Sequence, residues 1–125
     1  MNIVDSSLWI EYFFDNDIDQ SIIDILKDTD NLCVPVISLY EVYKKFLSMG
    51  ENKKANVAVA IMKNAAVINI EPQLAILAAD LGKQYKLPMA DSLIYATAVL
   101  YNADLYTQDK HFENLDHVNY YEKND

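Results

Sequence analysis

The feature that most constrains the fold is a regular alternation of short apolar runs with longer segments whose apolar residues recur at helical spacing. Five runs have the length and composition of strands, at residues 1–4, 32–37, 66–70, 105–108 and 118–121. Strands separated by helices imply parallel pairing through right-handed crossovers, with helices on both sides of the sheet. We therefore expect an α/β fold of three layers, α/β/α, around a central, mainly parallel sheet of four to five strands.

Between the runs, the helical patterns cover residues 6–15, 18–26, 39–47, 55–62, 72–81 and 90–100. Pro72 and Pro88 favour a first helical turn, and Gly50 is placed to end the helix before it. Ser38 is placed to cap the third helix, and Pro35 suggests that the second strand ends there or lies at an edge. The segment 90–100 is apolar on nearly every side, which is typical of a helix in the core.

Length and composition predict one folded domain spanning residues 1–125. Hydrophobic residues make up 52% of the chain, and glycine and proline together occupy only five positions. No segment approaches the roughly 18 uncharged apolar residues that a membrane span requires, and the first residues carry no signal-peptide pattern. Cys33 is the single cysteine, so no intrachain disulfide can form. We expect a cytoplasmic protein without a membrane segment.

The charge balance limits how this chain could bind nucleic acid. Its 10 basic residues, all lysines, face 19 acidic ones, for a net charge of −9. Because phosphate neutralisation drives non-specific binding, a broad basic nucleic-acid face is excluded. A divalent cation held by clustered carboxylates could still bind RNA, since it reverses the local charge where a phosphate sits. The second implication is a basic protein partner.

Acidic side chains stand where the expected strands pass into helices, which is where functional groups gather in an open parallel sheet. Asp5 and Asp109 directly follow strands, Glu41 follows the strand at 32–37, and Asp91 opens the apolar helix. The ordinary alternative for each is a helix cap or a favourable interaction with the helix dipole. Asp91 is the strongest candidate, because a carboxylate entering an apolar helix needs a partner.

Glu41 is the weakest of the four acids on periodicity. A helical wheel places it opposite the apolar stripe of Leu39, Val42 and Phe46, so taken alone it would be a solvated residue. The site therefore has either three or four acids at this point of the argument. A structure separates the two cases by where the Glu41 side chain points.

If the four acids converge, they form an all-oxygen site that suits Mg²⁺ or Mn²⁺. His111 and His117 do not complete a zinc set, and His111 is expected to be structural in the turn after Asp109. Such a site fits phosphodiester hydrolysis. Ser7 and Thr107 could orient carboxylates or water, the alternatives being a helix cap and an ordinary strand side chain. Some of the nine tyrosines could stack bases, although packing in the core or in a dimer explains them better. The candidates for stacking are Tyr101, Tyr106, Tyr120 and Tyr121.

Four blocks resemble PIN-domain proteins of the VapC toxin type: residues 4–10 (VDSSLWI), 38–41 (SLYE), 89–98 (MADSLIYATA) and 105–112 (LYTQDKHF). The resemblance implies metal-binding acids at Asp5, Glu41, Asp91 and Asp109, and supporting hydroxyls at Ser7 and Thr107. It also implies an Mg²⁺- or Mn²⁺-dependent endoribonuclease, held inactive as a toxin by a cognate antitoxin and often assembled as a homodimer.

The chain departs from the family pattern beside the fourth acid. Many relatives carry arginine there, where this chain has Gln108 and Lys110, and another acid where it has His111.

Two other functions are compatible with the class of fold. One is a catalytically inactive PIN-like binding module, against which the retention of all four acids speaks. The other is a phospho-acceptor signalling domain, which needs an acidic pair near the first strand and a lysine at a late strand end. Asp5 is followed by two serines, and the segment from Thr107 to Asp109 contains no lysine.

Overall fold

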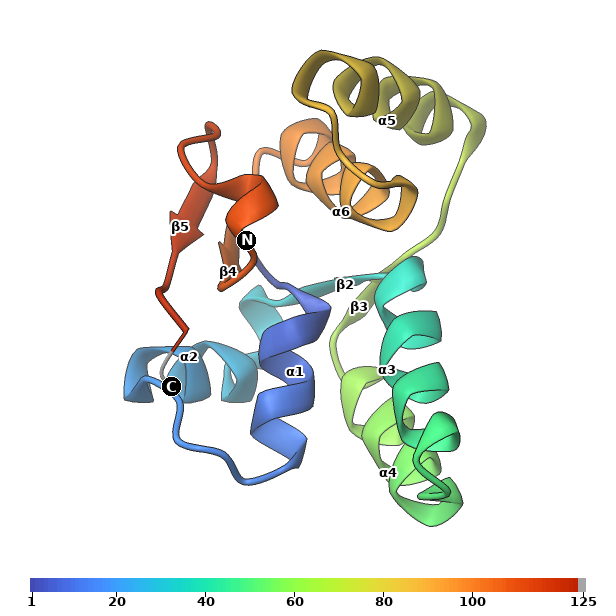
Figure 1. Ribbon diagram of the computed structural model, residues 1–125, viewed down its shortest axis with the longest axis vertical. Helices are drawn as coiled ribbons and strands as arrows, with labels where there is room; N and C mark the ends of the chain where they lie inside the picture. Colours follow the sequence, from blue (N-terminus) through green and yellow to red (C-terminus); the bar gives the residue numbers. More distant parts are fainter. Residues whose placement is uncertain (124–125) are drawn as a thin grey trace.

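The structure, a computed structural model, describes residues 1–123 (Figure 1). Its five strands all pair in parallel, in a three-stranded sheet of order β1-β4-β5 and a two-stranded sheet β2-β3. A single parallel bridge between Asn2 and Leu32 joins the two sheets into one twisted array. The expectation of a parallel sheet is confirmed. The strands are β1 (Asn2–Val4), β2 (Cys33–Pro35), β3 (Ala66–Ile68), β4 (Asp104–Thr107) and β5 (Val118–Tyr120).

Within residues 1–123, six α-helices connect the strands in the order expected from the sequence, together with two short 3₁₀ turns. Pro72 occupies the first turn of its helix as predicted, and Gly50 follows the helix before it with a φ of +74°. The helices are α1 (Ser6–Phe13), α2 (Gln20–Lys27), α3 (Val36–Ser48), α4 (Asn52–Met62), α5 (Pro72–Tyr85) and α6 (Met89–Leu100); the 3₁₀ turns are η1 (Thr29–Asn31) and η2 (Lys110–Phe112).

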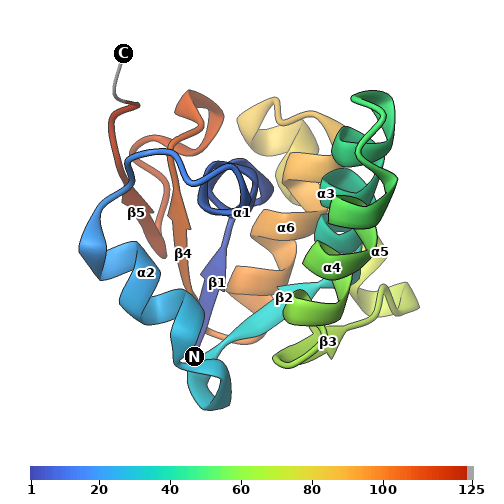
Figure 2. The same cartoon turned by 90° about the horizontal axis from the view of Figure 1, so that it is seen from below.

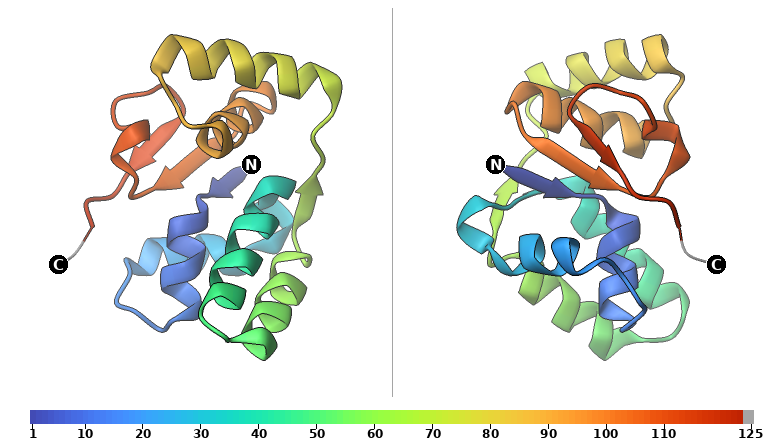
Figure 3. Two further views of the ribbon diagram at one scale, coloured as in Figure 1. Left: turned by 45° about the vertical axis from the view of Figure 1, so that its right-hand side comes forward. Right: turned by 90° about the vertical axis from the view of Figure 1, so that its left-hand side faces the viewer.

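Helices cover both faces of the sheet (Figures 2 and 3), and alternate residues of the strands pack into opposite layers. Val4 and Val34 join one core cluster with residues of α1, α2, α3 and α4. Ile3 and Leu105 point the other way, into a cluster with α6 and η2. This is the alternation of a sheet buried on both faces, and it confirms the three-layer α/β/α architecture.

Helix α6 lies in the core, as its apolar composition predicted. Ile94, Tyr95, Ala96 and Ala98 are all buried, the first three on different sides of the helix. Pro88 is not inside the first turn as expected, because it is the N-cap residue and α6 begins at Met89. Within residues 1–123, no helix is long and apolar enough to cross a bilayer.

The boundary between β2 and α3 differs from the prediction. The strand was expected to run to Ile37, but it ends at Pro35, which is the N-cap residue of α3. The β-branched residues Val36 and Ile37 suggested a strand, yet tertiary packing of Ile37 against the α6 cluster places them in a helix. Ser38 is therefore inside the first turn instead of capping it, and Glu41 falls in the second turn.

Candidate active site

The parallel pairing of β1 with β4 brings two of the predicted site residues together. Val4 is in register with Tyr106, and the Asp5 amide donates a hydrogen bond of 2.9 Å to the Tyr106 carbonyl. Asp5 and Thr107 therefore leave neighbouring strands at the same edge of the sheet. The Thr107 hydroxyl donates to Asp5 Oδ2 at 2.9 Å, across 102 positions of sequence.

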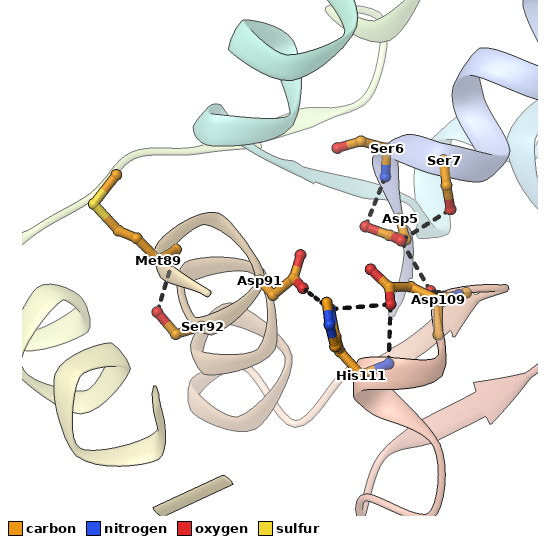
Figure 4. Close-up of polar contacts among 9 residues, drawn as sticks. Asp5, Ser6, Ser7, Met89, Asp91, Ser92, Asp109 and His111 are labelled. Atoms are coloured by element: carbon orange, nitrogen blue, oxygen red, sulfur yellow. Dashed lines mark hydrogen bonds and ion pairs between the residues drawn. The ribbon is translucent and has the colours of Figure 1, made fainter. Parts of the chain in front are cut away.

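The Asp5 carboxylate is buried, with 4% of its surface exposed, and accepts three hydrogen bonds (Figure 4). Oδ1 accepts from the Ser6 amide at 2.9 Å, which is the helix-capping contact of α1. Oδ2 accepts from Thr107 and from the Ser7 hydroxyl at 3.0 Å. Helix capping explains the contact of Oδ1 only. It does not account for the hydroxyls of Ser7 and Thr107, which both donate to Oδ2.

Burial raises the pKa of Asp5 from 3.8 to about 7. The hydrogen bonds from Thr107 and Ser7 lower that pKa, and the negative charges of Asp91 and Glu41 raise it. A carboxylate that is both dehydrated and surrounded by other acids gains from a nearby cation. The electrostatics of this site therefore favour binding of a positive ion.

Asp109 is held just beyond β4 by backbone contacts. Its amide donates to the Thr107 hydroxyl at 3.0 Å, so Thr107 contacts both Asp5 and Asp109. Its Oδ1 accepts from the amide of His111 at 2.9 Å and caps η2. The side chain is thereby fixed beside the carboxyl end of the sheet, at the edge where Asp5 lies.

Asp91 reaches the same place from the first turn of α6. Its Oδ2 lies 2.8 Å from Nδ1 of His111, which is also 3.2 Å from Asp109 Oδ1. Burial raises the pKa of Asp91, while the hydrogen bond with His111 lowers it. The same hydrogen bond, followed by the charge of Asp109, raises the pKa of His111. His111 thus bridges two predicted site acids, as Figure 4 shows.

Glu41 does not point into solvent, contrary to the reading of its helix alone. It is half-buried, and its Oε1 accepts a hydrogen bond of 2.7 Å from the Ser6 hydroxyl of α1. Since Ser6 also donates its amide to Asp5, this serine connects the two acids. The structure therefore brings Glu41 to the rim of the site through a contact between α1 and α3.

Among residues 1–123, one group offers ligand atoms that all lie within 4.8 Å of one another, and it consists of Asp91, Asp109 and His111. Asp5 and Glu41 stand next to this group without belonging to it. No lysine forms an ion pair with any of these acids in the described part of the chain, so the imidazole is their only paired side-chain base. A set dominated by carboxylate oxygens suits a hard divalent cation.

Two residues of the site were not recognised in the sequence. His111 was assigned to a structural turn, although its place two residues after Asp109 puts it on the same loop. Ser6 was not considered, because its hydroxyl acts on Glu41 across 35 positions of sequence, a pairing that periodicity does not reveal.

The sequence model of the PIN domain matches residues 3–118, which is most of the chain and includes every acid of the site. The chain belongs to the PIN-domain family. The family resemblance of the four sequence blocks is thereby confirmed. A search of curated proteins finds no match to this PIN-domain protein.

Solved structures show the same fold. One is a chain of a toxin-antitoxin complex from Klebsiella pneumoniae, with a TM-score of 0.76, 22% identity and coverage of 94% of this chain and 95% of that one. Another belongs to DNA-bound VapBC from Salmonella typhimurium, with a TM-score of 0.76, 16% identity and coverage of 97% and 98%. A third is Mycobacterium tuberculosis VapC20, a toxin that cleaves the sarcin-ricin loop, with a TM-score of 0.70, 14% identity and coverage of 84% and 87%.

Proposed function

We propose that this PIN-domain protein is a metal-dependent endoribonuclease that hydrolyses phosphodiester bonds of RNA. The observation that carries the proposal is the convergence of acids from different elements, at the ends of β1 and β4 and on α3 and α6. Asp91 and Asp109 share a single imidazole, and the pKa of Asp5 is raised by burial first and then by the charges of Asp91 and Glu41. At a pH where all of them are ionised, clustered carboxylates of this kind are stabilised by a compensating charge.

Mg²⁺ or Mn²⁺ is the cofactor that the donors fit, with Asp5, Glu41, Asp91 and Asp109 as the acids that hold it directly or through water. When bound, such an ion supplies an activated water and neutralises charge that develops on the phosphate. His111 adds one nitrogen donor to the oxygen set. Manganese accepts imidazole more readily than magnesium does, so this chain's own residue favours Mn²⁺.

The hydroxyls keep the acids in position. Thr107 and Ser7 donate to Asp5 Oδ2, which directs that carboxylate and limits its rotation. Thr107 also fixes the backbone of Asp109, so one hydroxyl sets the spacing of two acids. Ser6 holds Glu41 by the same means from the other side. Preorganised ligands of this kind lower the cost of assembling a reactive geometry.

As its biological role, we infer the toxin of a toxin-antitoxin pair. The support is the fold shared with chains of toxin-antitoxin complexes and the net charge of −9, which favours a basic antitoxin. Co-purification of the native chain with the product of a neighbouring gene tests this. A homodimer is the assembly that the family resemblance implies, and light scattering of the purified chain measures it.

Cleavage of total RNA with Mn²⁺, Mg²⁺ or EDTA tests the activity. We expect cleavage with either metal, none with EDTA, and loss of cleavage in Asp5→Asn. Asp80→Asn is the matched control, because it removes one exposed carboxylate on α5 and should leave cleavage intact. Cleavage that persists in EDTA or in Asp5→Asn contradicts the proposal. Binding of RNA without cleavage under all conditions would instead identify an inactive binding module.

A further inference from the structure

A hollow on the exposed face of α3 adjoins the acidic site. It has a volume of about 290 Å³ and shares Glu41 with the site. Its other lining residues are Tyr40, Lys44, Lys45 and Ser48, and it is open to solvent. The proposed catalytic function leaves these neighbours of Glu41 without a role.

Tyr40 and Lys44 are held together on this face. Lys44 Nζ donates a hydrogen bond of 3.2 Å to the Tyr40 hydroxyl and lies 5.5 Å from the centre of its ring. The spacing of four residues stacks the two side chains along the helix. Tyr40 is 56% exposed, so more than half of its surface is open to a ligand beside a cation. An ammonium group has three donors, and two of those on Lys44 remain for another partner.

Two of the five residues that line the α3 hollow are lysines and one is an acid, although the chain carries a net charge of −9. In the described part of the chain, Lys44 and Lys45 have no carboxylate oxygen within 4.0 Å, as is true of every other lysine there. A second hollow, of about 210 Å³, has four acids and one lysine in its lining and would repel phosphate. The α3 face is thus where a polyanion could be held beside the site. The acids of the second hollow are Glu11, Asp17, Asp19 and Glu122.

Three of the four tyrosines that the sequence suggested for base stacking are worse placed, and the fourth, Tyr120, is partly buried at the end of β5. Tyr106 and Tyr121 pack against each other with ring centres 6.3 Å apart, and both are partly buried. Tyr101 is exposed but caps the carboxyl end of α6, whereas Asp91 lies in the first turn of that helix. Tyr40 is exposed and lines the same hollow as Glu41, an acid of the site, so its ring can receive a substrate base there.

We propose that Tyr40, Lys44 and Lys45 form a subsite for single-stranded RNA next to the scissile phosphate. Tyr40 stacks on one base, and the two lysines contact phosphates about one helical turn, roughly 5.4 Å, further along α3. Stacking tolerates any base, so the subsite holds unpaired RNA without reading its sequence. This inference rests on the proposed function, because it takes the strand that leads into the hydrolytic site to be RNA.

The test compares Tyr40→Ala and the double variant Lys44→Gln/Lys45→Gln with the wild type. A matched control is Lys27→Gln/Lys63→Gln, which removes the same charge. Those two lysines end α2 and α4, on the approach to the starts of β2 and β3, away from the strand ends that carry the acids. All variants alter exposed side chains.

Two measurements are made on each variant. The first is binding of a fluorescent single-stranded RNA of mixed sequence in EDTA, at several salt concentrations. The second is KM and kcat for RNA cleavage with Mn²⁺. We expect Tyr40→Ala to weaken binding and raise KM about 10-fold with kcat little changed, and Tyr40→Phe to restore both. Lys44→Gln/Lys45→Gln should reduce the slope of log affinity against log salt by about 1.4.

The inference is overturned if Lys44→Gln/Lys45→Gln binds RNA like the control, or if Tyr40→Ala lowers kcat and leaves KM unchanged. Loss of dimer formation in these variants with unchanged RNA binding would assign the face to a second copy and also overturn it. Failure of the proposed function has a different signature. In that case the wild type shows no metal-dependent cleavage at all, while the binding comparison among variants still decides the subsite.

Discussion

The substitution Asp5→Asn should stabilise the metal-free protein while it removes a proposed metal ligand. The Asp5 carboxyl is buried and has a pKa of about 7, against 3.8 for an ordinary aspartate. Because the folded-state pKa is the higher one, the unfolded chain loses its proton first as the pH rises. Ionisation therefore favours unfolding from pH 3.8 upward, and the penalty is complete above about pH 7.

The size of the effect follows from the same shift. At about 1.4 kcal/mol per pKa unit, the penalty is about 2 kcal/mol at pH 5 and about 4 kcal/mol at pH 8. Asparagine keeps an acceptor for the Ser6 amide and carries no charge, so the variant escapes the penalty. We expect its free energy of unfolding to exceed that of the wild type by these amounts in EDTA.

Urea unfolding at pH 5 and pH 8 measures both values. Asp80→Asn serves as the control for the loss of one exposed carboxylate and should change stability little at either pH. Added Mn²⁺ should then stabilise the wild type more than Asp5→Asn, by about 2.7 kcal/mol at a metal concentration 100 times the dissociation constant. The reasoning is refuted if Asp5→Asn is no more stable than the wild type at pH 8, or if its gain is equal at both pH values.

Four further outcomes are expected. Thr107→Val removes the hydroxyl that donates a hydrogen bond to Asp5. It should lower the free energy of unfolding in urea by about 1–3 kcal/mol and abolish most of the RNA cleavage. Glu41→Gln should weaken Mn²⁺ binding in calorimetry and leave the unfolding midpoint unchanged. His111→Asn should lower the affinity for Mn²⁺ more than that for Mg²⁺; equal losses would contradict a nitrogen ligand. Phe46→Ala, at a fully buried position, should cost about 3–5 kcal/mol in the same unfolding assay.

The order of strands and helices was predictable because hydrophobic periodicity reports burial directly. The buried residues of β1 and β2 are all apolar, and the apolar surface of α6 indicated a core helix. The start of α3 was not predictable from Val36 and Ile37, since β-branched residues are common in strands and their packing partners lie elsewhere in the chain. Because α3 begins earlier than predicted, Glu41 lies in its second turn and not in its first.

The part of the site at the sheet edge could be anticipated from topology. Asp5 follows β1, Thr107 is the last residue of β4 and Asp109 lies just beyond it, so their proximity needs only the parallel pairing of β1 with β4. Ser7 needs only its place two residues after Asp5. His111 and Ser6 required side-chain geometry, because a loop imidazole and a helix-start hydroxyl have many possible partners until the chain is folded.

Helix α3 contributes residues to the core, to the acidic site and to the proposed RNA subsite. The rotation of the helix about its axis decides which residues face each of them. Successive residues of a helix point about 100° apart, so burial of Val42 and Phe46 also decides where Glu41 and Tyr40 point. Glu41 turns toward α1, where Ser6 holds it, and Tyr40 turns to solvent. A cavity at Phe46 that lets α3 rotate should therefore lower RNA cleavage at temperatures where the protein remains folded. The direction of the Glu41 side chain is thus set by the packing of α3. Its position in the sequence alone therefore suggested a solvated residue and not a member of the site.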